Sequence, residues 1–257
     1  MFRLSVCADT VFQSLPFETR VKEIARAGFW VEFWGWPGRN IDAIAVDPDV
    51  RMSAFTGYLD GSLVHPDALA TFLRGVEQSL AIAERLQCRE LFISTGALSY
   101  EGKVIHPIAS HPATRWITAY KGLCRVAELA EKHNVVYHLE QLNTKVEHAG
   151  YPLPRVEDVV RLIAEVGSPR IRLLFDVYHT QIEEGNLIQT IQDYHKFIGY
   201  VHVSDVPGRH EPGTGEINYP RVAQALREVG YQGAIGLEAY PLNDDYQAMT
   251  RFREIFS

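Results

Sequence analysis

Four acidic or imidazole side chains each stand at the end of a short apolar run in the second half of the chain. Asp176, for example, follows Leu-Leu-Phe, and Glu238 follows Ile-Gly-Leu. Runs of this kind are typical of buried parallel strands, and barrel enzymes carry their catalytic groups at the C-terminal ends of such strands. Three carboxylates and one imidazole at one barrel mouth would form an oxygen-rich site for a divalent metal ion. The four residues are Glu140, Asp176, His202 and Glu238.

The donor types in this set indicate which metal ions would bind. Carboxylate oxygens with one imidazole favour Mg²⁺ or Mn²⁺ and would also accept Co²⁺ or Zn²⁺. A structural zinc site would instead use cysteines, but Cys7, Cys88 and Cys124 show no Cys-x-x-Cys spacing. Taken singly, Glu140 could belong to a buried ion pair and His202 could be a core histidine. Four such groups at the ends of consecutive predicted strands favour a functional site.

Two further polar residues lie where they could bind a substrate. His179 follows Asp176 by three residues, so both side chains lie near one turn after the predicted strand. Arg209 lies in a loop rich in glycine and proline, residues 204–219, which is either an ordinary solvated turn or part of substrate recognition. An arginine at this position can clamp a carboxylate or a phosphate through two hydrogen bonds.

The segment around the end of the second predicted strand is aromatic. Phe33, Trp34 and Trp36 either pack in the core or form an apolar wall beside a small substrate. Glu32 lies within the same strand, and we expect it to support the barrel interior rather than to react.

Strand-like and helix-like patterns alternate along the whole chain. The clearest helical periodicity runs from Pro66 to Gln87, and another covers residues 116–133. Eight such repeats predict an α/β fold, a single (β/α)8 TIM barrel. A doubly wound sheet is the alternative, but its glycine fingerprint is missing after the first strand. The predicted strands cover residues 3–8, 30–34, 52–56, 89–95, 135–140, 171–176, 199–204 and 234–239.

Length, charge and composition limit the partners that this chain can have. With 257 residues, 46% of them hydrophobic, the chain suffices for one barrel domain spanning 1–257. The formal net charge of −7 argues against nucleic acid and anionic membranes, since both demand a basic face. The first residues lack the pattern of a signal peptide, and no apolar stretch reaches membrane-spanning length. We therefore expect a cytoplasmic protein whose partner is a small molecule.

Three segments carry a family resemblance: Asp-Val-Tyr-His-Thr-Gln-Ile-Glu-Glu-Gly-Asn-Leu (176–187), Arg-His-Glu-Pro-Gly-Thr-Gly-Glu-Ile-Asn-Tyr-Pro (209–220) and Val-Gly-Tyr-Gln-Gly-Ala-Ile-Gly-Leu-Glu (229–238). They resemble hydroxypyruvate isomerase and its relatives among the xylose isomerase-like barrels, which include ketose epimerases of the tagatose 3-epimerase type. The resemblance implies a (β/α)8 barrel that forms homo-oligomers and binds one divalent metal. It implies that Glu140 and Glu238 are the catalytic acid and base, that His179 and Arg209 contact substrate, and that the ligands are Glu140, Asp176, His202 and Glu238.

Two departures from the hydroxypyruvate isomerase pattern bear on the substrate. Position 202 is histidine, as in the ketose epimerases, where hydroxypyruvate isomerases carry glutamine. Ala239-Tyr240-Pro241 replaces the Tyr-Lys-Pro that usually follows the last glutamate in hydroxypyruvate isomerases. The chain therefore lacks a lysine that would be a natural partner for a substrate carboxylate.

These observations predict a metal-dependent isomerase of a small α-hydroxy carbonyl compound or sugar, in which two glutamates move a proton through an enediolate. The alternative is a ketose 3-epimerase, which shares these steps but returns the proton elsewhere. Two other classes are weighed against it. A metallonuclease of the AP-endonuclease type would require a basic surface and a histidine-rich multi-metal cluster. A non-catalytic sugar-binding barrel would have no need for competent residues at all four ligand positions.

Overall fold

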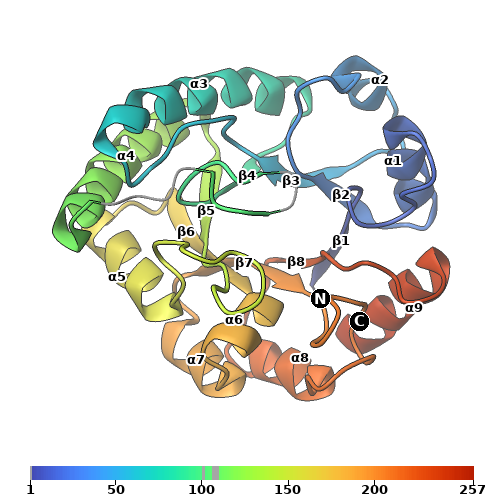
Figure 1. Ribbon diagram of the computed structural model, residues 1–257. Helices are drawn as coiled ribbons and strands as arrows, with labels where there is room; N and C mark the ends of the chain where they lie inside the picture. Colours follow the sequence, from blue (N-terminus) through green and yellow to red (C-terminus); the bar gives the residue numbers. More distant parts are fainter. Residues whose placement is uncertain (1, 100–101, 106–109) are drawn as a thin grey trace.

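The fold is a closed barrel of eight parallel strands surrounded by helices (Figure 1). The computed structural model describes residues 2–99, 102–105 and 110–257. Each strand pairs with its sequence neighbour, and β1 closes the ring against β8, where Val6 pairs with Leu237. The predicted (β/α)8 barrel is therefore confirmed.

The strands lie where the apolar runs predict them, each within two residues at either end. Short runs of β-branched and aromatic residues suit strands that are buried on both faces. The strands are β1 (Arg3–Cys7), β2 (Trp30–Phe33), β3 (Met52–Thr56), β4 (Glu90–Ile93), β5 (Val136–Glu140), β6 (Ile171–Asp176), β7 (Ile198–Val203) and β8 (Ala234–Leu237).

The helices follow the predicted periodicity less closely at their ends. The periodic segment from Pro66 begins as the short 3-10 helix η1 (Pro66–Ala68) and continues as α3 (Leu69–Arg85). Helix α4 (Pro112–His133) begins four residues before its apolar pattern, because Pro112 stands in its first turn and His111 Nδ1 accepts from Ala113 N. The others are α1 (Phe17–Arg26), α2 (Ile41–Ala45), α5 (Val156–Val166), α6 (Val177–Glu183), α7 (Leu187–Tyr194), α8 (Tyr219–Glu228) and α9 (Asp245–Phe256).

A polar layer crosses the barrel interior beneath its mouth. The fully buried Tyr200 of β7 donates to Glu32 Oε2 at 2.5 Å, and Ser5 Oγ donates to the same oxygen at 2.6 Å. Gly236 on β8 makes room for this carboxylate, since a Cβ there would lie 2.4 Å from its oxygens. Glu32 thus supports the interior as predicted, on a layer directly below the strand ends.

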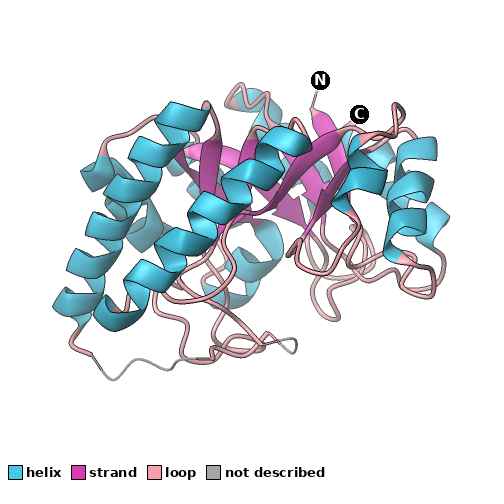
Figure 2. Cartoon of the chain, turned by 90° about the horizontal axis from the view of Figure 1, so that it is seen from above, coloured by secondary structure: helices cyan, strands magenta, loops and turns pink. Residues whose placement is uncertain are grey.

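The long loops gather at one end of the barrel, where all eight strands end (Figure 2). The chain termini lie at the opposite end. This arrangement brings the ends of β5, β6, β7 and β8 to one mouth, although Glu140 and Glu238 are 98 positions apart in the sequence. Within the described residues, no helix combines the length and the hydropathy that crossing a bilayer requires.

Candidate active site

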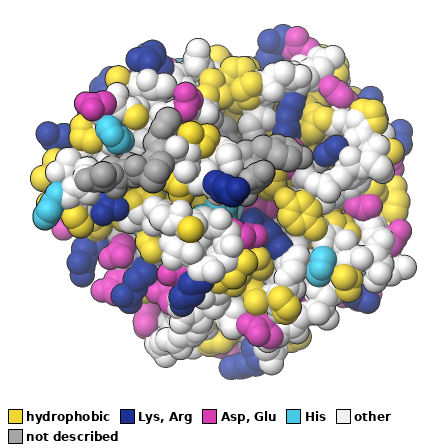
Figure 3. Space-filling model, viewed as in Figure 1, with side chains coloured by type: hydrophobic (Ala, Val, Ile, Leu, Met, Phe, Trp, Pro, Cys, Tyr) yellow, Lys and Arg dark blue, Asp and Glu magenta, His cyan; other side chains and the backbone are white. Residues whose placement is uncertain are grey.

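A cavity of about 480 Å³ opens at the C-terminal ends of the strands. In the space-filling view of this face, acidic, basic and histidine side chains are visible together near the centre (Figure 3). The described residues that line the cavity combine these charged groups with aromatic and aliphatic side chains. They include Trp34, Tyr58, Phe92, Leu98, Glu140, Leu142, Glu147, His148, His179, His202, Arg209 and Glu238.

Three of the four predicted metal ligands form a compact group with His179. Glu140 ends β5, Asp176 ends β6 and caps α6 by accepting from His179 N at 2.8 Å, and Glu238 directly follows β8. One potential ligand atom from each of these residues lies within 4.8 Å of the others. Strand register and the N-cap of α6 therefore bring together side chains that are far apart in the sequence.

His202, the fourth predicted ligand, lies beside this group. Its Nδ1 is 3.5 Å from Glu140 Oε1 and 3.7 Å from Glu238 Oε2. On the other side of the ring, Nε2 lies 3.1 Å from Glu32 Oε1, in the polar layer below. The imidazole thus bridges the glutamates of the mouth and a buried carboxylate, while its role as a ligand stays a prediction.

Several atoms of the group lack a hydrogen-bond partner although they are buried. These atoms are Glu140 Oε1, His179 Nε2 and both ring nitrogens of His202. Unpaired polar atoms in a protein interior are rare and cost roughly 1–3 kcal/mol each. A divalent cation at the mouth would give Glu140 Oε1 and His202 Nδ1 a partner, so the residues present fit a metal site.

The charges of the group perturb one another strongly. Burial, together with the charge of Glu140, raises the pKa of Asp176 to about 7. Burial and the charge of Glu238 likewise raise the pKa of Glu140. Burial would also raise the pKa of Glu238, but Arg209, His202 and Trp34 Nε1, which donates to Glu238 Oε1 at 2.6 Å, lower it. Burial, helped by repulsion between the carboxylates, thus raises the pKa of Asp176 and Glu140, and a cation would offset both effects.

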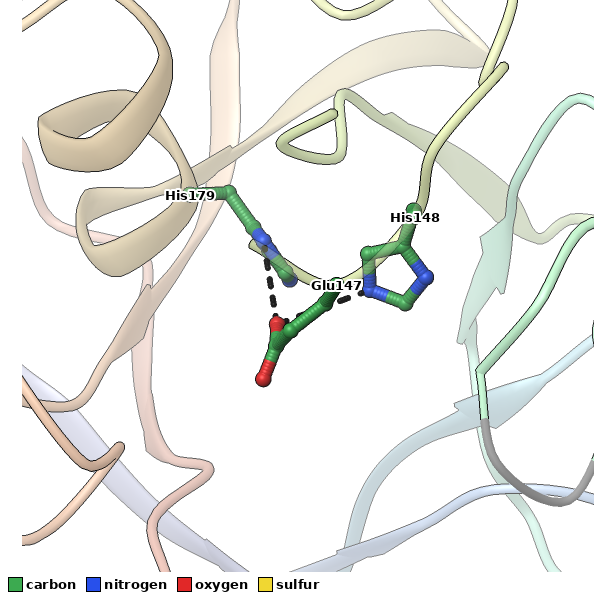
Figure 4. Close-up of side chains that lie close together, drawn as sticks. All are labelled: Glu147, His148 and His179. Carbon is green, nitrogen blue, oxygen red and sulfur yellow. Dashed lines mark ion pairs between the residues drawn. The ribbon is translucent and has the colours of Figure 1, made fainter. Parts of the chain in front are cut away.

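Glu147 is a residue of this site that the sequence pattern does not reveal. Its Oε2 lies 3.7 Å from His148 Nε2 and 3.8 Å from His179 Nδ1 (Figure 4). Arg209 Nη1 donates to the same oxygen at 3.1 Å, and Tyr178 donates to Oε1 at 3.2 Å. Glu147 lies in the loop after β5 and not at a strand end, so the pattern of strand ends does not predict it. The adjacent pair Glu147-His148 is the only sequence feature that indicates a functional role there.

The three residues of Figure 4 form a second cluster of possible metal ligands. Hydrogen-bond donors that already bind Glu147 and His179 argue against a metal ion in this cluster. The guanidinium of Arg209 already neutralises Glu147, and Asn143 Nδ2 lies 2.7 Å from His179 Nδ1. This cluster is therefore better described as an ion-pair and hydrogen-bond network that holds Arg209.

The loop after β7 places Arg209 at the mouth. Asp205 is fully buried and accepts from the backbone N–H groups of Val206, Gly213 and Ile217 at 2.8–3.0 Å. Arg209 itself has a left-handed backbone with φ 56°, and its carbonyl accepts from Tyr240 N. Its Nη2 donates to Glu238.

The two residues predicted to contact substrate, Arg209 and His179, both line the cavity. Their contact with substrate stays a prediction.

The aromatic residues at the end of β2 take both predicted roles, some packing in the core and one lining the cavity. Phe33 is fully buried in the core, and Trp36 donates to Ser79 Oγ at 3.1 Å. Trp34 lines the cavity and reaches Glu238. Only Trp34 therefore fits the predicted apolar wall.

Comparison with known proteins identifies the family. The sequence profile of the xylose isomerase-like TIM barrel family matches residues 21–254. The chain belongs to this family. Within it, a putative hydroxypyruvate isomerase from Mus musculus is 30% identical over 98% of this chain and 94% of its own length. A 2-oxo-tetronate isomerase from Pectobacterium atrosepticum is 31% identical over 90% of this chain and 89% of its own length.

Solved structures show the same barrel. A protein described as AP endonuclease, family 2, from Brucella melitensis has a TM-score of 0.90, with 26% identity over 99% of both chains. A D-psicose 3-epimerase has a TM-score of 0.82 over 99% of both chains, and at 17% identity this likeness shows the fold alone. The predicted resemblance is confirmed, and so is the broad prediction of an isomerase.

Proposed function

We propose that the protein is a metal-dependent isomerase or epimerase that moves a proton next to the carbonyl of an α-hydroxy carbonyl compound. The observation that carries the proposal is the convergence of Glu140 and Glu238 on one cavity, with Asp176 and His202 beside them. These two glutamates come from strands β5 and β8, which are not neighbours in the barrel, so they approach the cavity from different sides. Two carboxylates on different sides of a substrate can remove a proton and return one elsewhere.

The proposed metal ligands are Glu140, Asp176, His202 and Glu238, and Mg²⁺ or Mn²⁺ is the expected ion. When bound, the metal supplies the positive charge that stabilises an enediolate and makes the proton acidic enough to be removed. Glu32, behind His202, would hold the imidazole in one orientation and raise its basicity, as carboxylates behind metal-binding histidines do.

The remaining charged residues would position the substrate. His179 carries an unpaired Nε2 at the cavity and would donate to a substrate oxygen, because its Nδ1 already accepts from Asn143 N. Burial, with the charges of Arg209 and His148, lowers the pKa of His179 well below its usual value, so the ring is neutral at pH 7. Arg209 is held by Glu147 and Glu238 and would contact substrate from a fixed place.

The nuclease and the non-catalytic barrel are supported less well. The structure with a TM-score of 0.90 is described as an AP endonuclease, but the net charge of −7 and the carboxylates around the cavity of this chain disfavour a nucleic-acid backbone. A barrel that only binds sugar would have no use for two glutamates beside a metal-fitting group. The homo-oligomer expected from the resemblance remains part of the proposal.

Hydrogen exchange tests the proposed reaction directly. The protein is incubated with Mn²⁺ and candidate ketoses and keto acids in D₂O, and deuterium at the carbon next to the carbonyl is followed by NMR. We expect exchange that requires both protein and metal and that stops when EDTA is added. Exchange that is unaffected by EDTA, or its absence from every compound tested, would refute the proposal.

A further inference from the structure

We propose that the substrate is a neutral polyhydroxy ketone, that is, a sugar, rather than a keto acid. This inference rests on the proposed function and adds the charge class of the molecule that binds at the same site. Three observations carry it: the charges of the cavity, the partners that Arg209 already has, and the shape and polarity of the cavity wall.

The cavity is strongly acidic. Glu140, Glu147 and Glu238 line it, and Asp176 adjoins them. Among the described lining residues, Arg209 alone is a lysine or arginine. With all four carboxylates ionised, these groups sum to three negative charges, and one divalent cation would still leave one. The remaining negative charge would repel an anionic substrate but not a neutral one.

Arg209 is committed to carboxylates of the protein itself. Its Nη1 donates to Glu147 and its Nη2 to Glu238, so the two ends of the guanidinium are held by different residues. Tyr178 fixes this arrangement, because its hydroxyl donates to Glu147 and the guanidinium carbon lies 5.2 Å from its ring centroid. A substrate carboxylate would have to compete with Glu147 or Glu238 for the guanidinium.

The rest of the wall suits a sugar. Trp34, Tyr58 and Phe92 provide aromatic surface for C–H groups. The carboxylates beside them can accept hydrogen bonds from hydroxyls, and His179 Nε2 can donate one, since His179 Nδ1 accepts from Asn143 N. Sugars present both kinds of surface at once. The volume of about 480 Å³ lies in the range of pockets for ligands much larger than a three-carbon acid.

If this inference holds, the chain acts on a different class of substrate from the keto acids that appear in its relatives' names. Hydroxypyruvate and 2-oxo-tetronate are both carboxylates, and the relatives named for them are about 30% identical to this chain. That level of identity preserves a barrel and its reaction type more readily than the residues that recognise the far end of a substrate.

The test compares neutral and anionic substrates under one assay. Deuterium exchange with Mn²⁺ is measured for D-psicose, D-tagatose and L-ribulose and for hydroxypyruvate and 2-oxo-tetronate, each against a blank with metal alone. We expect kcat/KM for the best ketose to exceed that for either acid by about a hundredfold or more. A preference for an acid overturns the inference and leaves the proposed function standing. Exchange into none of the compounds overturns both.

A charge variant tests the physical reason. Glu147→Gln keeps the shape of the side chain, removes one negative charge and frees Arg209 Nη1. The ratio of acid to ketose kcat/KM should rise by about tenfold or more. Glu216→Gln, which removes an exposed charge from the loop after β7, is the matched control and should leave the ratio unchanged. An unchanged ratio in a folded Glu147→Gln protein, or an equal rise in the control, would overturn the electrostatic account.

Discussion

Glu140 and Glu238 each have two proposed tasks, as metal ligands and as the groups that move the proton. Replacing either with glutamine keeps the side chain's shape but removes the base and one ligand charge. Glu140→Gln and Glu238→Gln should therefore each lower kcat by at least about a thousandfold. Steady-state kinetics measures the loss, and circular dichroism checks that the barrel is intact. Near-normal turnover in one variant would exclude that glutamate from the mechanism.

Arg209 influences both the substrate and the charge of its neighbour. If the substrate is neutral, Arg209→Ala removes one ordinary hydrogen bond to it, which should lower kcat/KM by the equivalent of about 0.5–1.5 kcal/mol. Arg209 is also the largest influence that lowers the pKa of Glu238, so its removal raises that pKa. Because the base works ionised, the acidic limb of the pH–rate profile should move to higher pH. A profile that stays in place would show that Glu238 does not titrate in this limb.

Glu32 matters because the folded barrel places it beside His202, which is distant in the sequence. It lies 1% exposed on β2 and faces His202 of β7 across the barrel. Glu32→Gln removes the negative charge behind the imidazole while the carboxylates at the mouth stay in place. Metal affinity, measured by calorimetry, should fall about 10–100-fold. Unchanged affinity would mean that His202 does not bind the metal.

At the level of elements, the strands were predictable and the loops were not. Apolar runs such as Leu-Leu-Phe before Asp176 specify a buried strand and place its last residue at the mouth, because parallel strands all end on one side. The start of α4 was not predictable from periodicity, since the segment from Pro112 to Arg115 lacks the apolar repeat. Glu147 was missed for a related reason: its position depends on how a loop folds over His179.

The loop after β7 depends on one buried carboxylate. Asp205 accepts from three backbone N–H groups that would otherwise lack partners within this turn. Asp205→Ala should destabilise the protein by about 1–3 kcal/mol and displace Arg209, so kcat/KM falls although residue 205 does not line the cavity. Thermal unfolding and kinetics together measure the effect. A variant that loses stability while its kinetics stay normal would show that Arg209 is positioned independently of Asp205.

For the whole molecule, the clustered carboxylates link metal binding to stability. The folded-state pKa of Asp176 is raised from 3.8 to about 7, and that of Glu140 is also raised. A carboxyl with a raised folded pKa binds more protons folded than unfolded, so the metal-free protein should lose stability as pH rises from about 4 to 7. Metal should therefore raise Tm more at pH 7.5 than at pH 5. An equal rise at both pH values would indicate binding elsewhere.

The most direct test of the central claim is anomalous diffraction from crystals grown with Mn²⁺. The account predicts one peak bound by Glu140, Asp176, His202 and Glu238 at about 2.0–2.4 Å, with His202 Nδ1 facing the ion. A peak between Glu147, His148 and His179, or a metal that His202 does not touch, would contradict it.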